Sequence, residues 1–186
     1  MNIVLDVCKY SRNYFQSVNS AINSIGSIEL NNLSQMVLEV INSKRKIIIA
    51  GNGGSSAIAS HVSVDFTKAA KVRAINFNES DLITCFANDY GYENWIAMAL
   101  RAYADAGDLV ILISSSGQSQ NIISAANTAV EMGLNLVTLS GFNSENPLRR
   151  LGAINLWVNS DSYNVVEMAH HVWLLAVVEV IAEIQR

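Results

Sequence analysis

Short apolar runs that end in glycine or serine constrain the fold of this chain more than any other feature. Residues 46–50 read KIIIA, residues 109–114 read LVILIS and residues 134–140 read LNLVTLS. Continuous apolar runs of this length, rich in β-branched side chains, predict strands that are buried on both faces, as in a parallel sheet. Two weaker runs, 72–77 and 154–158, predict two more strands.

Segments with apolar residues at helical spacing separate these runs. The predicted helices cover residues 55–69, 80–88, 93–105, 119–132 and 163–184. Strands that alternate with helices indicate parallel strands joined by right-handed crossovers. We therefore predict an α/β fold, a three-layer sandwich with about five parallel strands, which forms one domain over residues 1–186.

Two more helices are predicted before the first strand, over residues 2–25 and 29–43, with Gly26 between them. Because both precede the sheet, we interpret residues 1–44 as a helical hairpin appended to the α/β core. The final helix, over residues 163–184, is largely apolar. That pattern fits either a subunit interface or packing within the subunit, and the sequence leaves both open.

Composition excludes several classes of protein. The chain has 12 Lys plus Arg and 16 Asp plus Glu, a net charge of −4, and 51% of its residues are apolar. This balance excludes a disordered chain, and so few cations exclude nucleic acid as a partner. No run reaches about 18 uninterrupted apolar residues, so no membrane span is expected. The N-terminal segment lacks the pattern of a signal peptide, and we expect a cytoplasmic protein in which Cys8 and Cys85 are buried free thiols.

The first predicted strand ends in a glycine-rich turn, residues 51–56, which read GNGGSS. Glycines allow left-handed backbone conformations, and the following helix directs its free amide groups into the turn. Such a turn at the carboxyl end of a parallel sheet suits an anion or a polar sugar. It lacks the Walker A ending and the GxGxxG fingerprint, so a nicotinamide dinucleotide is not favoured.

A second turn, residues 114–119, reads SSSGQS and follows another buried strand. Hydroxyls and the amides of a helix start can surround a phosphate without Lys or Arg, and neither turn contains a basic residue. The alternative is that the serines cap the helix that starts near Ser119. One serine suffices for a cap, so four of them favour a phosphate site.

At these turns the sequence resembles the sugar isomerase (SIS) domain family, and more narrowly the phosphoheptose isomerases, which act on sedoheptulose 7-phosphate. The segments that carry the resemblance are residues 50–66, 86–94, 113–122 and 136–142. The resemblance implies a homotetramer whose sites are built from more than one subunit. It implies that the phosphate is held by Ser55, Ser114, Ser115, Ser116 and Ser119. It also implies that the sugar is bound by Asn52, Gly53 and Gly54, with Asn88 and Asp89 close to substrate.

An aldose–ketose isomerase moves one proton between adjacent carbons and another between adjacent oxygens, usually through an enediol, and therefore needs a base and an acid. His61 and Asp65 lie four residues apart after the first turn, on one face of a predicted helix. The resemblance implies a His and a catalytic Glu at these positions, and both ligate zinc in metal-bound members. Asp65 is one methylene shorter than that Glu. The alternative is a structural pair on a solvated helix face.

The final helix carries Glu167, His170 and His171. The family pattern has Gln and a distal His where this chain has Val166 and Leu174. We predict that Glu167 and His170 act in catalysis with His61 and Asp65, and we prefer His170 to His171 as the replacement acid. The same four residues, His61, Asp65, Glu167 and His170, are of a type that can ligate zinc. The sequence leaves open a site with zinc and a site without a cofactor.

The sequence leaves three functions open. The first is an isomerase that acts on a phosphorylated ketose of about seven carbons through an enediol. The second is a non-catalytic protein that binds sugar phosphates or acts as an assembly protein. The third is an isomerase for another sugar phosphate, with a rebuilt site.

Overall fold

The structure is a computed structural model, and it describes residues 6–186. The predicted start of the first helix at residue 2 lies outside the described residues. A single sheet of five parallel strands has the order β2-β1-β3-β4-β5. The strands are β1 (Ile47–Gly51), β2 (Ala74–Asn76), β3 (Leu109–Ile113), β4 (Asn135–Ser140) and β5 (Ile154–Trp157). Each predicted strand is therefore confirmed within about two residues.

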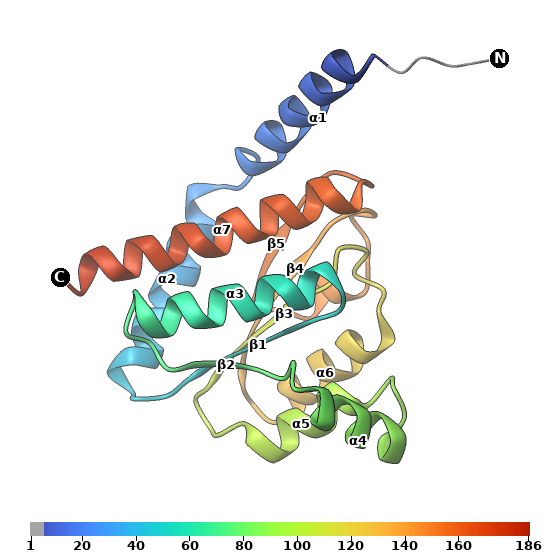
Figure 1. The fold of residues 1–186 in the computed structure, drawn as a ribbon. Coiled ribbons are helices and arrows are strands. Elements are labelled where there is room, and N and C mark those ends of the chain that lie inside the picture. The colour runs from blue at the N-terminus through green and yellow to red at the C-terminus, as the bar shows by residue number, and fades with distance from the viewer. Residues whose placement is uncertain (1–5) are drawn as a thin grey trace.

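Helices cover both faces of the sheet, which confirms the three-layer sandwich (Figure 1). One face packs on α2 (Ser27–Asn42), α3 (Gly54–Lys68) and α7 (Tyr163–Ile184). The other packs on α4 (Ser80–Tyr90), α5 (Trp95–Tyr103) and α6 (Gln120–Glu131). A 3-10 helix (Leu148–Arg150) lies between β4 and β5.

The central strands are buried on both faces, as the apolar runs predicted. All residues of β1 and β3 are buried. Successive side chains of a strand point to opposite faces. Ile47 and Ile49 therefore join the core under α2, α3 and α7, while Ile48 and Ala50 join the core under α5 and α6.

The neighbouring strands β1 and β3 mark the place where the connections change direction. The helix after β1, α3, lies on one face, and the helix after β3, α6, lies on the other. A crevice opens at the carboxyl ends of two such strands, and open α/β sheets bind ligands there. Both predicted ligand turns begin at this crevice, because one follows β1 and the other follows β3.

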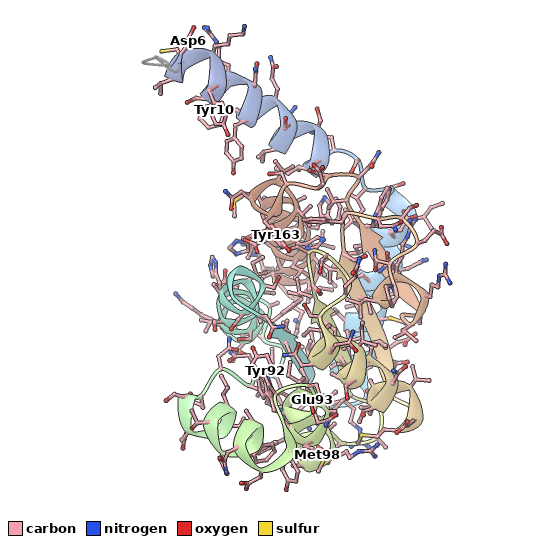
Figure 2. All side chains as sticks on the ribbon, turned by 90° about the vertical axis from the view of Figure 1, so that its right-hand side faces the viewer. Asp6, Tyr10, Tyr92, Glu93, Met98 and Tyr163 are labelled. Carbon is pink, nitrogen blue, oxygen red and sulfur yellow. The ribbon has the colours of Figure 1, made fainter. Side chains whose placement is uncertain are left out.

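The first helix, α1 (Val7–Ile22), extends away from the sheet (Figures 1 and 2). Both α1 and α2 contact α7, and the Trp173 indole donates a hydrogen bond of 2.8 Å to the carbonyl of Ile22. The two predicted N-terminal helices are present, with α7 rather than each other as their main packing partner. Exposed apolar side chains remain on α1, among them Tyr10 and Phe15.

Cys8 and Cys85 are free thiols, as expected, but the prediction that both are buried is wrong. Cys8 lies on the projecting helix α1, and Cys85 lies on α4, which has no buried residue. Both helices carry exposed apolar side chains in the single chain. Apolar neighbours in the sequence were therefore no guide to the burial of these two thiols.

The final helix α7 has the length and hydropathy of a membrane-spanning helix, although its sequence is interrupted by polar residues. Half of its most apolar window is buried inside the chain. The buried residues contact α1, α2, α3 and the sheet. This burial is typical of the core helix of a globular protein.

Candidate active site

The first ligand turn joins β1 to α3 through Asn52 and Gly53. Gly53 has a φ of 53° and a ψ of −120°, a conformation that glycine adopts without a steric cost. It is the N-cap of α3 and supplies no side-chain cap. The Ser56 amide donates to the Asn52 carbonyl, so in the described part of the chain the amides of Gly54 and Ser55 are left for an anion, which the positive end of the helix dipole favours.

The second ligand turn joins β3 to α6 and carries the four predicted serines. Ser119 is the N-cap of α6, yet its side chain makes no capping hydrogen bond. The Ser114 and Ser119 hydroxyls lie 3.2 Å apart, so they hydrogen-bond to each other. The Ser115 hydroxyl is buried and has no hydrogen-bond partner in the described part of the chain. The capping explanation therefore fails for Ser119, and a ligand can satisfy Ser115.

A pocket of about 110 Å³ lies where the two turns meet. Its lining comprises Asn52, Ser55, Ile113, Ser114, Ser115, Ser116, Ser119, Tyr163 and Glu167. The volume corresponds to about four water molecules at ~30 Å³ each. Such a volume suits a phosphate group, and a longer sugar would have to extend out of the pocket.

The Glu167 carboxylate forms one wall of this pocket, directly against the backbone of Gly54. A Cβ atom placed on Gly54 would lie within 3 Å of all three carboxylate atoms of Glu167. Burial raises the pKa of Glu167 above its ordinary value. Tyr163 lines the same pocket from the first residue of α7, where Figure 2 labels it. Glu167 is thus placed to hold a proton at a higher pH than an exposed glutamate does.

Three side chains further along α3 and α7 form a chain of contacts. His61 Nε2 lies 3.2 Å from Asp65 Oδ2, and His61 Nδ1 lies 2.8 Å from His171 Nε2. An ionised carboxylate only accepts hydrogen bonds, so Nε2 of His61 carries the proton that faces Asp65. In a neutral His61, Nδ1 then accepts, and His171 donates from Nε2.

Partial burial lowers the pKa of His171, as does the neighbouring His61, while Asp65 raises it. His171 therefore stays neutral to lower pH than an exposed histidine. A neutral His171 suits the donor role in the contact with His61, and the three side chains can pass a proton along one line.

His170, which the sequence led us to prefer to His171, lies apart from these three side chains. Its side chain is fully buried, and Nε2 lies 3.0 Å from the carbonyl oxygen of Ser140. A carbonyl only accepts, so His170 donates from Nε2, and its Nδ1 has no partner among residues 6–186. Burial lowers the pKa of His170 to about 4. The structure thus places His170 in the core rather than in the pocket.

The four residues considered as zinc ligands do not come together. In the part of the chain that the structure describes, no three His, Cys, Asp or Glu side chains are grouped as metal ligands. His170 is turned toward Ser140, and both ring nitrogens of His61 face other side chains. The residues of this chain therefore do not fit the four-ligand zinc site that we considered.

Two more predicted site residues lie outside the pocket. Asn88 and Asp89 are near the end of α4, both exposed, and the Asn88 amide donates to Asp89 at 2.9 Å. The structure also adds Tyr163, which the sequence did not single out, and His171, which the sequence analysis placed second to His170. No local motif marks Tyr163. His171 had a signal, because it is four residues after Glu167 and so shares its helix face.

A larger cavity, of about 560 Å³, lies between α1 and the start of α7. Its lining has Asn, Gln, Ser, Ala and Val side chains, with no ionisable group among the described residues. General acid–base chemistry requires a titratable side chain. The smaller pocket at the two turns is therefore the candidate active site.

Comparisons with known proteins identify the family of the chain. The profile of the SIS domain family matches residues 12–141. The chain is 34% identical over 126 residues to a phosphoheptose isomerase of Campylobacter concisus, a match that covers 64% of this chain and 66% of that protein. It is 31% identical over 161 residues to a phosphoheptose isomerase of Sulfurimonas denitrificans, with 83% and 81% covered.

The fold is also similar to a solved structure. A phosphoheptose isomerase from Francisella tularensis superposes with a TM-score of 0.88 at 22% identity, over 96% of this chain and 100% of that one. At this identity the superposition shows the fold alone, while the family profile and the sequence identities above show the family. The chain therefore belongs to the SIS domain family, among the phosphoheptose isomerases.

Proposed function

We propose that the protein is an aldose–ketose isomerase for a sugar phosphate, most closely a sedoheptulose 7-phosphate isomerase that works through an enediol. The observation that carries the proposal is a pocket shared by the Glu167 carboxylate and the buried Ser115 hydroxyl, which has no hydrogen-bond partner among residues 6–186. A phosphate-binding turn beside an acid–base group is what such a reaction requires. The whole chain serves as one SIS domain in this proposal.

The phosphate is held by Ser55, Ser114, Ser115, Ser116 and Ser119 together with the first amides of α3 and α6. Asn52, Gly53 and Gly54 contact the sugar. Amides and hydroxyls in a small, half-enclosed pocket bind an anion without cations. The absence of Lys and Arg from the pocket lining is therefore compatible with a phosphorylated substrate.

The reacting end of the sugar lies along the two helices that leave the pocket. His61 is six residues after Ser55 on α3, about 9 Å along a helix that rises 1.5 Å per residue. His171 is one turn after Glu167 on α7. A seven-carbon ketose with its phosphate at C7 carries its carbonyl at the opposite end. A sugar that extends from the phosphate pocket between α3 and α7 thus brings C1 and C2 toward these histidines.

The chemistry takes two steps, each with one proton lost and one proton gained by the sugar. A base removes a proton from C1 of the ketose, and the C2 carbonyl oxygen gains a proton, which gives the enediol. The O1 proton then leaves while a proton is delivered to C2, and the aldose forms. We assign the carbon proton to the Asp65–His61–His171 chain and the oxygen protons to Glu167, whose raised pKa favours the protonated form. No step requires a metal ion.

Asn88 and Asp89 lie outside the pocket of their own chain, and we propose that they approach the pocket of a second subunit. Exposed apolar side chains on α1 and α7 support a homotetramer, because large apolar side chains that stay exposed in one chain mark contact surfaces. We further propose a cytoplasmic location for the assembled enzyme.

The test follows turnover of sedoheptulose 7-phosphate by the purified chain, beside sedoheptulose and other ketose phosphates. We expect the heptose phosphate to be converted and the unphosphorylated sugar to be a poor substrate. Ser115→Ala should raise KM about tenfold or more, because a hydrogen bond to a charged group contributes about 1.5–3 kcal/mol. The matched control is Ser124→Ala, which removes a hydroxyl that bonds to Asn94 outside the pocket.

Binding of a sugar phosphate without conversion of any ketose phosphate would contradict the isomerase and support the non-catalytic alternative. Conversion of a different ketose phosphate in preference to the heptose would support the third function, an isomerase for another sugar phosphate.

A further inference from the structure

We propose that Asn121 is a positioning residue, which fixes the side-chain amide of Asn52 so that one N–H of Asn52 points at an oxygen of the bound sugar. The inference rests on the proposed function and adds a residue to that site. Asn121 is the second residue of α6, its side chain is 3% exposed, and it does not line the pocket. It therefore acts on a ligand through Asn52.

The two asparagines form a reciprocal pair. Asn52 Nδ2 donates to Asn121 Oδ1 at 2.9 Å, and Asn121 Nδ2 donates to Asn52 Oδ1 at 2.9 Å. Two hydrogen bonds between planar amides allow one relative orientation, whereas a single bond leaves rotation about its axis. The pair thus holds the Asn52 amide in a fixed plane.

The neighbouring backbone also determines which terminal atom is the oxygen in each of the two side-chain amides. The backbone amide of Ile122 donates to the Ser119 carbonyl at 3.0 Å and also lies 3.1 Å from the atom assigned as Asn121 Oδ1. A backbone N–H can only donate, so this atom is an oxygen and the other terminal atom of Asn121 is the nitrogen. The atom of Asn52 that faces this nitrogen is consequently the oxygen of Asn52. Neither amide can be flipped without placing two donors against each other.

The hydrogen bonds that Asn52 makes within the chain leave one N–H of its side-chain amide for a ligand. Its oxygen accepts from Asn121 and from the Tyr92 hydroxyl at 3.3 Å, so both lone pairs are used. Its nitrogen carries two hydrogens, and one of them is donated to Asn121. Asn52 lines the pocket, so the second hydrogen is the group that it can offer there. The sugar atom that it meets must be an acceptor, such as a carbonyl or hydroxyl oxygen.

The pair also connects the two ligand turns. Asn52 follows β1 and Asn121 begins the helix after β3, so the bonds cross the crevice between two neighbouring strands. Tyr92, labelled in Figure 2, approaches Asn52 from the segment between α4 and α5. The donor for the sugar is thereby held at a fixed place relative to the serines that hold the phosphate.

The experiment is a double-mutant cycle with Asn52→Ala, Asn121→Leu and the double variant, read in kcat, KM and inhibition by inorganic phosphate. Asn121→Leu should lower kcat/KM for sedoheptulose 7-phosphate about 10- to 100-fold, because loss of orientation at a reacting substrate costs rates of this order. Inhibition by phosphate should change less than about threefold. The double variant should be no worse than Asn52→Ala alone, because Asn121 works only through Asn52.

The matched control is Asn155→Leu, which removes a partly buried amide that bonds to Thr138 on the edge of the sheet, and it should keep full activity. Losses of kcat/KM that are additive in the double variant would show that Asn121 has a merely structural role, and so would weaker phosphate inhibition of Asn121→Leu. Either result would overturn the inference. Asn121→Ala gives the same reading if Asn121→Leu does not fold.

A wild-type protein that binds sedoheptulose 7-phosphate without converting it would contradict the proposed function alone. The same cycle read as dissociation constants then decides the inference. A wild-type protein that binds no sugar phosphate at all would contradict both.

Discussion

Nε2 of His171 lies 2.8 Å from Nδ1 of His61, and the opposite nitrogen of His61 faces Asp65 at 3.2 Å. This contact joins α7 to α3, one helical turn after the pocket residue Glu167. In the proposed mechanism His171, and not the adjacent His170, exchanges a proton with the sugar. The first prediction tests this distinction.

His171→Gln should lower kcat by roughly 10²- to 10⁴-fold, the usual contribution of a general acid or base. His170→Gln should keep kcat within about threefold, because His170 is buried and bonds to the Ser140 carbonyl away from the pocket. Steady-state kinetics on both variants, with the unfolding free energy measured in parallel, makes the comparison. Equal losses in the two variants would remove His171 from the mechanism.

Gly54→Ala should reduce activity while leaving the fold stable. The new Cβ would displace the Glu167 carboxylate, which is the end of a flexible side chain, so the cost in unfolding free energy should stay below about 1 kcal/mol. A shift of the carboxylate by about 1 Å should lower kcat/KM about 100-fold.

The opposite outcome is expected for Gly133→Ala, the control for the Gly54 variant. Its Cβ meets open space, but its φ of 65° disfavours alanine, so stability falls and activity is kept. An active Gly54→Ala enzyme would show that the position of the Glu167 carboxylate is unimportant.

Acid should destabilise the protein through His170. Burial lowers the pKa of His170 to about 4 in the folded chain, against about 6.5 when unfolded. Between these values the unfolded state binds a proton that the folded state does not, so stability falls as the pH drops from 6.5 to 4. The loss approaches about 3 kcal/mol at about 1.36 kcal/mol per pKa unit.

Denaturant unfolding at several pH values measures this loss. His170→Gln removes the titrating group and keeps a donor for Ser140, so its unfolding free energy should fall less steeply over the same range. Parallel curves for the two proteins would exclude His170 as a source of the acid sensitivity.

A buried ion pair should anchor the start of β1. Lys46 Nζ lies 2.6 Å from both Asp108 Oδ2 and Asp105 Oδ2, and Asp108 also accepts the backbone amides of Lys46 and Asp105. Asp108→Ala should therefore lower the unfolding free energy by about 3 kcal/mol, the low end for breaking a buried pair because Asp105 remains. Glu131→Ala, which breaks an exposed pair with Arg101, should lower the unfolding free energy by less than about 1 kcal/mol. Urea titration of both variants measures the two losses. A similar loss of unfolding free energy in both variants would contradict the claim that a buried ion pair anchors the start of β1.

Most of the fold could be predicted because its strands are continuous apolar runs. Residues 109–113 and 47–50 are buried on every side, so no other element competes for these sequences. The pocket could be predicted as well, because two ligand turns that follow neighbouring parallel strands must meet at one edge of the sheet.

The orientation of α7 could not be predicted as readily. Most of this helix is apolar, so the buried face is poorly marked in the sequence. One signal was present: His170 shares a row with Val166 and Leu174, four residues to either side, and all three are fully buried. Asn88 and Asp89 are exposed on α4 and bond to each other, and nothing in their local sequence shows which surface they approach.

The most direct test of the account is conversion of sedoheptulose 7-phosphate in deuterated water, with the product examined by NMR and mass spectrometry. The account predicts that the aldose phosphate gains one solvent deuterium at C2, because the enediol is protonated there by a group that exchanges with water. It also predicts that His171→Gln slows this incorporation and His170→Gln does not. A substrate that is bound but acquires no deuterium, and yields no aldose, would contradict the account.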